Sequence, residues 1–406
     1  MNKKMLSEKI EAAKEMQKHL MPITPRPEIY FHKGEGHYLY DQTGKAYLDL
    51  VQGWAVNTLG HSPTIIQQAL LQQSTKLINP GPAFYNLPML ELANTLCQHS
   101  VFDQVFFANS GAEANEGAIK LARKWGQKQK QGAYKIITFE KGFHGRTLAT
   151  MSATGKDSFA PLFEPKVSGF KKVPFNQLEA TESAIDSSTV AIMLELVQGE
   201  AGVIPADPNF VEGLQQLCKK HNLLLIIDEV QTGIARTGSL FAYQHYNIQP
   251  DIMTLGKGLG GGMPISALLT NTQTSCFDYG DQGGTFNGNP VMCAVAQAVL
   301  ATVLQPNFIP HINTISSYLK HGLDKLSADF SLGEVRGKGL LIALDTNTVS
   351  ATSIVERARE QGLLLNAPNI QTLRFMPALT ITESEIDTAI EQLRHVLTHL
   401  KTQRCG

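Results

Sequence analysis

The chain has 406 residues, a length that is sufficient for two domains and a large core. Hydrophobic residues make up 43% and charged residues 17%, which excludes wholesale disorder, and the net charge of −1 provides no general attraction to nucleic acid or to an anionic membrane. The five cysteines are odd in number and show no C-x-x-C spacing, so the composition predicts reduced thiols in a cytoplasmic protein, with neither a disulfide framework nor a metal site.

The N-terminal segment predicts a helix followed by a hairpin. Residues 1–20 are charged throughout, which is typical of an exposed amphipathic helix and unlike the apolar core of a signal peptide. The apolar run 223–227 is far too short to span a bilayer. Residues 37–50 alternate around the turn Asp41–Gly44, and this pattern indicates a β-hairpin.

The middle of the chain alternates short apolar runs with helical patterns. The expected strands are 105–108, 135–139, 190–194, 223–227 and 252–255, and the expected helices are 112–124 and 209–221. Such alternation predicts the α/β class, with a mostly parallel sheet that is covered by helices.

From residue 291 the pattern changes to two long helices, three short strands and a final helix. These elements are expected at 291–304, 311–326, 340–344, 363–365, 373–375 and from 384 onward. They predict a smaller α+β domain that the N-terminal hairpin also joins. We therefore expect an N-terminal segment 1–60, a large domain 61–290 and a C-terminal domain 291–406.

A lysine among five glycines is the most unusual local feature of the chain. Lys257 lies in Gly256-Lys-Gly-Leu-Gly-Gly-Gly262 after an expected strand, where burial would lower its pKa and make the amine nucleophilic. The same run formally matches the dinucleotide motif G-x-G-x-x-G, which leaves a nicotinamide-dependent dehydrogenase open. Pro264 follows closely, however, where that fold requires a helix to propagate.

Two further motifs end strands. The segment from Asn109 to Glu116 changes from strand to helix, so the N–H groups of Ser110, Gly111 and Ala112 are suited to bind a phosphate, although the S-x-x-E spacing also describes a simple capping box. Asp228 ends the apolar strand 223–227, a position at which ligands gather in open α/β sheets. It is a candidate partner for a cationic ring nitrogen, or else a helix cap.

Several other residues have a functional and a structural interpretation. Phe143 and Arg146, in Phe143-His144-Gly-Arg146, are able to stack on a planar ring and to bind a carboxylate, or to serve as a core aromatic beside a surface cation. Thr285 is a candidate for phosphate binding or a turn cap. Arg374, on an apolar strand, requires an anionic partner, for which Glu200 is the candidate.

The order and spacing of these motifs resemble the class III, ornithine/acetylornithine-type branch of the fold type I pyridoxal-phosphate aminotransferases, from about residue 22 to residue 399. The runs DEVQTGIARTG (228–238) and PDIMTLGKGLGGGMPISA (250–267) are the most specific parts of the resemblance. It implies a seven-stranded-type sheet, pyridoxal 5′-phosphate as the cofactor, and a homodimer.

The resemblance also implies a role for each cofactor-site residue. Lys257 would bind the cofactor covalently and later move the proton, and Asp228 would pair with its ring nitrogen. Gln231 would contact the ring hydroxyl. Phe143 and Val230 would lie on the two faces of the ring, with His144 beside it. The phosphate would be bound by Ser110, Gly111 and Ala112 and, from the neighbouring subunit, by Thr285.

For the substrates, the resemblance implies two arginines. Arg374 would bind the α-carboxylate of glutamate or 2-oxoglutarate, and Glu200 would cover it when the donor brings no carboxylate there. Arg146 would bind the other carboxylate. Trp54 and Tyr85 would lie near the substrate tail, and the run Ala83-Phe-Tyr85-Asn86 is similar to ornithine aminotransferases.

The implied activity is transfer of the terminal amine of N2-acetylornithine to 2-oxoglutarate, which gives the semialdehyde and glutamate, as in arginine biosynthesis. The alternative donors are ornithine, succinylornithine and 4-aminobutyrate. The remaining alternatives are a nicotinamide-dependent dehydrogenase and an inactive binding homologue.

Overall fold

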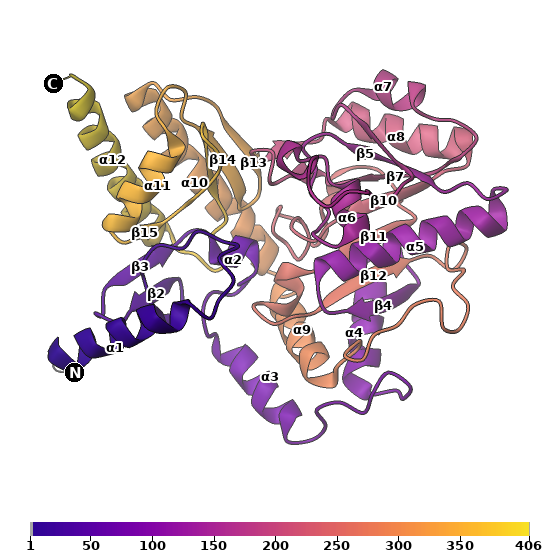
Figure 1. Cartoon of the computed structure of the whole chain (residues 1–406), viewed down its shortest axis with the longest axis horizontal. Coiled ribbons are helices and arrows are strands. Elements are labelled where there is room, and N and C mark those ends of the chain that lie inside the picture. The colour runs from indigo at the N-terminus through magenta and orange to yellow at the C-terminus, as the bar shows by residue number, and fades with distance from the viewer. Residues whose placement is uncertain (1–2, 406) are drawn as a thin grey trace.

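The computed structural model describes residues 3–405, with the side chains of residues 10–402. Its centre is a seven-stranded sheet in the order β4-β12-β11-β10-β7-β5-β6 (Figure 1). These strands are β4 (Gln104–Ala108), β5 (Lys135–Phe139), β6 (Phe170–Val173), β7 (Thr189–Leu194), β10 (Leu224–Asp228), β11 (Ile252–Leu255) and β12 (Ser266–Thr270). All neighbouring pairs are parallel except those of β12, which runs antiparallel to β11 and β4. The α/β prediction is confirmed.

Alternate residues of the central strands face two separate helical layers. In β7, Ile192 and Leu194 belong to the core that Phe210 of helix α8 (Pro208–His221) enters, whereas Ala191 and Met193 join the core that contains Ile119 of α5 (Gly111–Gln129). A strand covered on both faces requires apolar residues at every position, because successive side chains point to opposite sides. This explains why the sequence shows unbroken apolar runs there.

The two ends of the chain meet in one small sheet, of order β1-β2-β3-β15. The hairpin is confirmed, since β2 (Tyr38–Asp41) pairs antiparallel with β3 (Ala46–Asp49), and β1 (Phe31–Glu35) lies beside β2. The fourth strand, β15 (Leu363–Leu364), pairs parallel with β3. The N-terminal hairpin and the C-terminal segment therefore share a sheet, whereas the boundaries at residues 60 and 290 stay a prediction.

The C-terminal part carries long helices around a second four-stranded sheet of order β13-β14-β17-β16. Its elements are α9 (Pro290–Val303), α10 (Phe308–Phe330), β13 (Val335–Lys338), β14 (Leu341–Asp345), α11 (Ala351–Glu360), β16 (Asn366–Asn369), β17 (Thr372–Phe375) and α12 (Glu383–Cys405). All three pairings are antiparallel, which agrees with the predicted α+β character. Figure 1 shows the second sheet with α10, α11 and α12 beside the N-terminal hairpin and apart from α7 and α8, whereas α9 packs against the helices at residues 64–74 and 87–98.

Several elements were not expected from the sequence. They include the strands β1, β6, β12, β13 and β16, a two-stranded ribbon of β8 (Val197–Gln198) and β9 (Ile204–Pro205), the helix α11, and the helices α2 (Gln52–Ala55), α3 (Thr64–Ser74), α4 (Leu87–Gln98), α6 (Leu148–Ala153) and α7 (Leu178–Ser183). The N-terminal helix α1 spans Lys3–Gln17. No single helix among residues 3–405 is long and apolar enough to cross a membrane; α9 and α10 reach that length and composition only together, across a 72° bend.

Candidate active site

Strands β5, β7, β10 and β11 end at the same edge of the sheet because they run parallel to one another. The segments that follow them, together with the start of α5, surround a cavity of about 300 Å³. Its lining residues are Gly111, Ala112, Asn115, Phe143, His144, Gly145, Arg146, Glu195, Glu200, Asp228, Val230, Gln231 and Lys257. This edge is where ligands bind in open α/β sheets.

A buried carboxylate with three partners lies at the base of the cavity. Asp228, the last residue of β10, accepts hydrogen bonds from Asn115 Nδ2 at 2.7 Å and from the backbone N–H of Val230 at 3.0 Å. Its Oδ2 also lies 2.8 Å from His144 Nδ1. Burial disfavours the imidazolium of His144, but the hydrogen bond and charge of Asp228 outweigh it and raise the pKa of His144. The Asp228 carboxylate is thus fixed in position by these three contacts.

Asn115 connects three of the segments at this edge, and the sequence analysis did not identify it. Its side-chain amide donates to the carbonyl of His144 at 2.7 Å as well as to Asp228, and its Oδ1 accepts from Thr254 Oγ1 at 2.6 Å. A polar residue on the buried face of an amphipathic helix, such as α5, requires hydrogen-bond partners, and that was the available signal.

Lys257 lines the same cavity as Asp228 and Glu195. It follows β11 in a 3-10 turn (Lys257–Gly260) with a φ of 39°, a left-handed value that few lysines adopt. Burial and the positive charge of Arg374 lower its pKa, although Glu195 and Asp228 oppose the shift. A lysine with a lowered pKa has a larger neutral, nucleophilic fraction at a given pH.

The glycines around Lys257 do not form a dinucleotide-binding turn. After the single 3-10 turn, Gly261 and Gly262 take φ values of 55° and 122°, and the chain enters strand β12 instead of a helix. The turn therefore lacks the helix N-terminus that binds the phosphates in a dinucleotide-binding fold. The dehydrogenase alternative loses its structural basis.

The start of α5 has a capping box and also N–H groups that are suited to bind a phosphate, the two interpretations of its motif. Ser110 and Glu113 form a capping box, in which Glu113 Oε2 accepts from the N–H of Ser110 at 2.8 Å. The expectation that Ser110 offers a free N–H is therefore wrong. The helix start leaves the N–H groups of Gly111 and Ala112 without an intrahelical acceptor, and both residues line the cavity. These two groups lie at the positive end of the helix, where an anion is favoured, and their assignment to the phosphate stays a prediction.

The Phe143 loop is held by a second carboxylate. The N–H of Phe143 donates to Glu195 Oε2 at 2.8 Å, and Glu195 directly follows β7. Burial raises the pKa of Glu195 to about 7. Glu195 was not among the expected site residues, although its position after a buried strand is the same signal that identified Asp228.

The two arginines expected to bind substrate differ in their surroundings. Arg374 is fully buried and donates to Glu200 Oε1 and to Asn366 Oδ1, both at 2.8 Å. Burial disfavours the charge of Glu200, but Arg374 outweighs it and lowers the pKa of Glu200. Arg146 is exposed at the cavity wall, and its guanidinium lies 5.1 Å from the ring centre of Phe159.

Five expected site residues lie outside the lining of this cavity: Ser110 and Arg374, described above, and Trp54, Tyr85 and Thr285. Trp54 is 51% exposed and Tyr85 is 83% exposed, and Thr285 is exposed in the loop before α9. The carbonyl of Trp54 lies 3.5 Å from Gln231 Nε2, which donates to it. The assignments of Trp54, Tyr85 and Thr285 to the substrate tail and to a neighbouring phosphate stay predictions.

A seven-stranded, mostly parallel sheet that presents a lysine, a buried aspartate and a helix N-terminus at one edge defines a fold type I pyridoxal-phosphate enzyme. The structure is similar to the ornithine aminotransferase from Toxoplasma gondii ME49, with a TM-score of 0.92 and 29% identity over 97% of this chain and 96% of that chain. It is also similar to the N-acetylornithine aminotransferase from Stenotrophomonas maltophilia K279a, with a TM-score of 0.83 and 33% identity over 96% and 99% of the chains.

The aminotransferase class-III family model matches residues 23–397. The chain is 56% identical to acetylornithine aminotransferase 2 from Bordetella pertussis and to the acetylornithine aminotransferase from Ralstonia nicotianae, in each case over 93% of this chain and 96% of the relative. The chain therefore belongs to the class III aminotransferases.

Enzymes of this class use pyridoxal 5′-phosphate, and a second Toxoplasma gondii ornithine aminotransferase structure has it at the active site. The cavity fits such a group. A Cβ atom built on Gly111 would lie 2.5 Å from Val230 Cγ1, so only glycine leaves the space beside Val230 open. Free helix N–H groups suit the phosphate, the Asp228 carboxylate suits a protonated ring nitrogen, and the amine of Lys257 suits an aldehyde.

Proposed function

We propose that the enzyme moves the terminal amino group of N2-acetylornithine to 2-oxoglutarate. The observation that carries this proposal is the difference between the two arginines. Arg374 is already neutralised by Glu200, whereas Arg146 has no carboxylate partner among the described side chains of residues 10–402. A donor with one carboxylate and a distant amine requires one free arginine, and a dicarboxylate acceptor requires both.

The proposed roles follow from the positions of the side chains. Arg146 binds the donor carboxylate and orients the terminal amine toward Lys257. Asp228, fixed by His144 and Asn115, keeps the ring nitrogen of the cofactor protonated. When bound, pyridoxal phosphate accepts the amino group and withdraws electrons from the substrate carbon. The lowered pKa of Lys257 allows its amine to take a proton from that carbon and to return it.

The named relatives support acetylornithine as the donor. The Bordetella and Ralstonia proteins, both called acetylornithine aminotransferases, are 56% identical to this chain, whereas the Toxoplasma ornithine aminotransferase is 29% identical. Ornithine is the second candidate, because Tyr85 belongs to a run that is similar to ornithine aminotransferases.

The proposed active form is a homodimer in which Thr285 binds the phosphate in the neighbouring site. Large apolar side chains are exposed around this loop: Leu71, Ile78, Phe84, Tyr85, Leu87 and Phe286. The segments are tied together, since Asn86 Nδ2 donates to the carbonyl of Gly288 and Asn289 Nδ2 to that of Ile78, both at 2.9 Å. A contiguous group of exposed apolar residues is typical of a protein–protein interface. Phe286→Asp should therefore give monomers in sedimentation analysis.

We also propose that the enzyme works in the cytoplasm. Cys97, Cys218, Cys276 and Cys293 form no disulfide among the described residues. Unpaired cysteines are typical of a reducing compartment.

A half-reaction screen with acetylornithine, ornithine, succinylornithine and 4-aminobutyrate tests the proposed donor. Purified holoenzyme is mixed with each donor in turn, and conversion to the aminated cofactor is followed spectroscopically. We expect acetylornithine to react with the highest kcat/KM. A faster reaction with ornithine would overturn the choice of donor, and no reaction with any donor would indicate an inactive homologue.

A further inference from the structure

Glu200 lies between two cations, not one. Its Oε1 pairs with Arg374 Nη2 at 2.8 Å, and its Oε2 lies 3.3 Å from Lys156 Nζ. Arg374 is fully buried, while Glu200 and Lys156 both remain partly exposed, with side-chain exposures of 25% and 34%. The carboxylate is therefore able to shift between a fixed guanidinium and a flexible ammonium.

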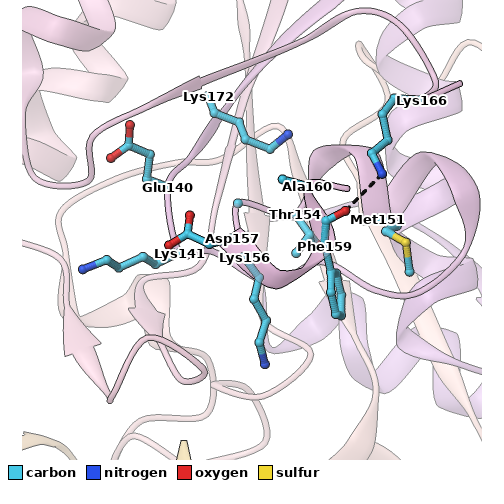
Figure 2. Close-up of a pocket in the computed structure, with 11 residues that line it drawn as sticks. Glu140, Lys141, Met151, Thr154, Lys156, Asp157, Phe159, Ala160, Lys166 and Lys172 are labelled. Atoms are coloured by element: carbon cyan, nitrogen blue, oxygen red, sulfur yellow. Dashed lines mark hydrogen bonds between the residues drawn. The ribbon is translucent and has the colours of Figure 1, made fainter. Parts of the chain in front are cut away.

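Lys156 differs from the other lysines around the neighbouring cavity of about 330 Å³. Lys166 and Lys172 are tied to backbone carbonyls, through Phe159 at 3.0 Å and Ser152 at 2.8 Å respectively. Figure 2 shows the ammonium of Lys156 pointing away from those two lysines, on the same side as the ring of Phe159. Lys156 thus lines this cavity but pairs with Glu200 of the active site.

One aromatic ring positions Lys156 relative to the substrate arginine. Phe159 is buried, contacts Phe143 edge-on at 6.1 Å, and has Arg146 and Lys156 at 5.1 and 5.8 Å from its ring centre. Cation–π attraction holds both cations near the same ring. Lys156 therefore shares one aromatic ring with Arg146 and contacts the Glu200 oxygen that Arg374 does not.

We propose that Lys156 is a positioning residue that receives Glu200 when the acceptor carboxylate binds Arg374. This inference rests on the proposed function, in which a dicarboxylate acceptor must displace Glu200 from Arg374. When a carboxylate moves away from a buried arginine, it loses its main source of stabilisation unless another cation is available to pair with it. Because Lys156 is already in contact, Glu200 remains paired after it moves. Lys156 then favours acceptor binding, and it leaves donor binding unaffected because Glu200 stays on Arg374.

The test is the equilibrium affinity of the holoenzyme for glutarate, measured by calorimetry. Glutarate has both carboxylates of the acceptor but no keto group, so it binds without turnover. Lys156→Met should weaken glutarate binding about two- to fivefold, the range of a partly exposed ion pair. Lys156→Arg should restore it. Lys141→Met is the matched control, because Lys141 lines the neighbouring cavity and has no ion pair within the described residues.

A double-mutant cycle separates positioning from general attraction of an anion. In a Glu200→Gln background there is no carboxylate for Lys156 to receive, so Lys156→Met should no longer weaken glutarate binding. An equal weakening in both backgrounds, or no weakening in either, would overturn the proposal. The KM for acetylornithine should change less than about twofold in Lys156→Met, since its binding leaves Glu200 in place. A failure of acetylornithine in the donor screen would not alter the glutarate result, so the two proposals fail separately.

Discussion

Asp228 and His144 form a buried pair, with 2.8 Å between Oδ2 and Nδ1, beneath the cofactor cavity. The folded-state pKa of His144 is raised, so this pair contributes stability that is fully present below the ordinary histidine pKa and is lost as the pH rises through the raised one.

Asp228→Asn should lower the pKa of His144, because burial would then act without the opposing charge. The titration of His144, followed by NMR, measures this directly. Transamination should fall about 10²- to 10⁴-fold, the usual effect of losing one group that positions a proton. An unchanged titration of His144 would show that the pair does not form.

The space beside Val230 should require a glycine at position 111. Gly111→Ala places a methyl group 2.5 Å from Val230 Cγ1 and should destabilise the protein by about 1–3 kcal/mol, with weaker pyridoxal-phosphate binding. Gly283→Ala is the matched control, because nothing lies within 4 Å of its built Cβ. Thermal unfolding and cofactor titration of both variants check this prediction, and equal behaviour of the two would refute it.

Lys257 should make the cofactor-free protein less stable at neutral pH. Burial and Arg374 lower its folded-state pKa, so the unfolded chain binds more protons than the folded one up to the ordinary lysine pKa. Lys257→Met should raise the melting temperature of the apoprotein at pH 7, and the difference should shrink toward pH ~10. A variant that melts below the wild type at pH 7 would contradict a buried, destabilised amine.

Arg374 should be required both for stability and for the acceptor. Arg374→Met leaves Glu200 and Asn366 without their buried partner and should cost about 3–5 kcal/mol. Arg374→Lys should recover part of the stability, because it keeps the charge, but not the affinity for 2-oxoglutarate, because it lacks the planar fork. Denaturant unfolding and acceptor KM values measure the two effects, and an acceptor KM that stays at the wild-type value in Arg374→Met would argue against the assignment.

The sequence predicted the parts of the fold that local patterns encode. The buried strands β5, β7, β10 and β11 were expected because most of their residues are apolar on both faces of the sheet. Strand β12 was missed, since its residues follow the glycine turn directly and its antiparallel direction depends on pairing with β4, which is far away in the sequence. Pairings of this kind cannot be read from a local pattern.

The site was predicted to a similar extent, for the same reason. Asp228 and Lys257 end or follow apolar strands, so strand-end reasoning identified them. Asn115 and Lys156 were missed, because their importance comes from partners at long range, Asp228 and Glu200. The capping box of Ser110 was recognised, but its consequence that the Ser110 N–H is occupied required the position of the Glu113 side chain.

Reduction of the holoenzyme with borohydride, followed by peptide mapping, tests the central claim most directly. Protein supplied with pyridoxal phosphate should carry the reduced cofactor on Lys257 alone, and Lys257→Ala should carry none. A label on a different lysine, or an unlabelled wild-type protein, would contradict the assignment of Lys257 as the cofactor-binding residue.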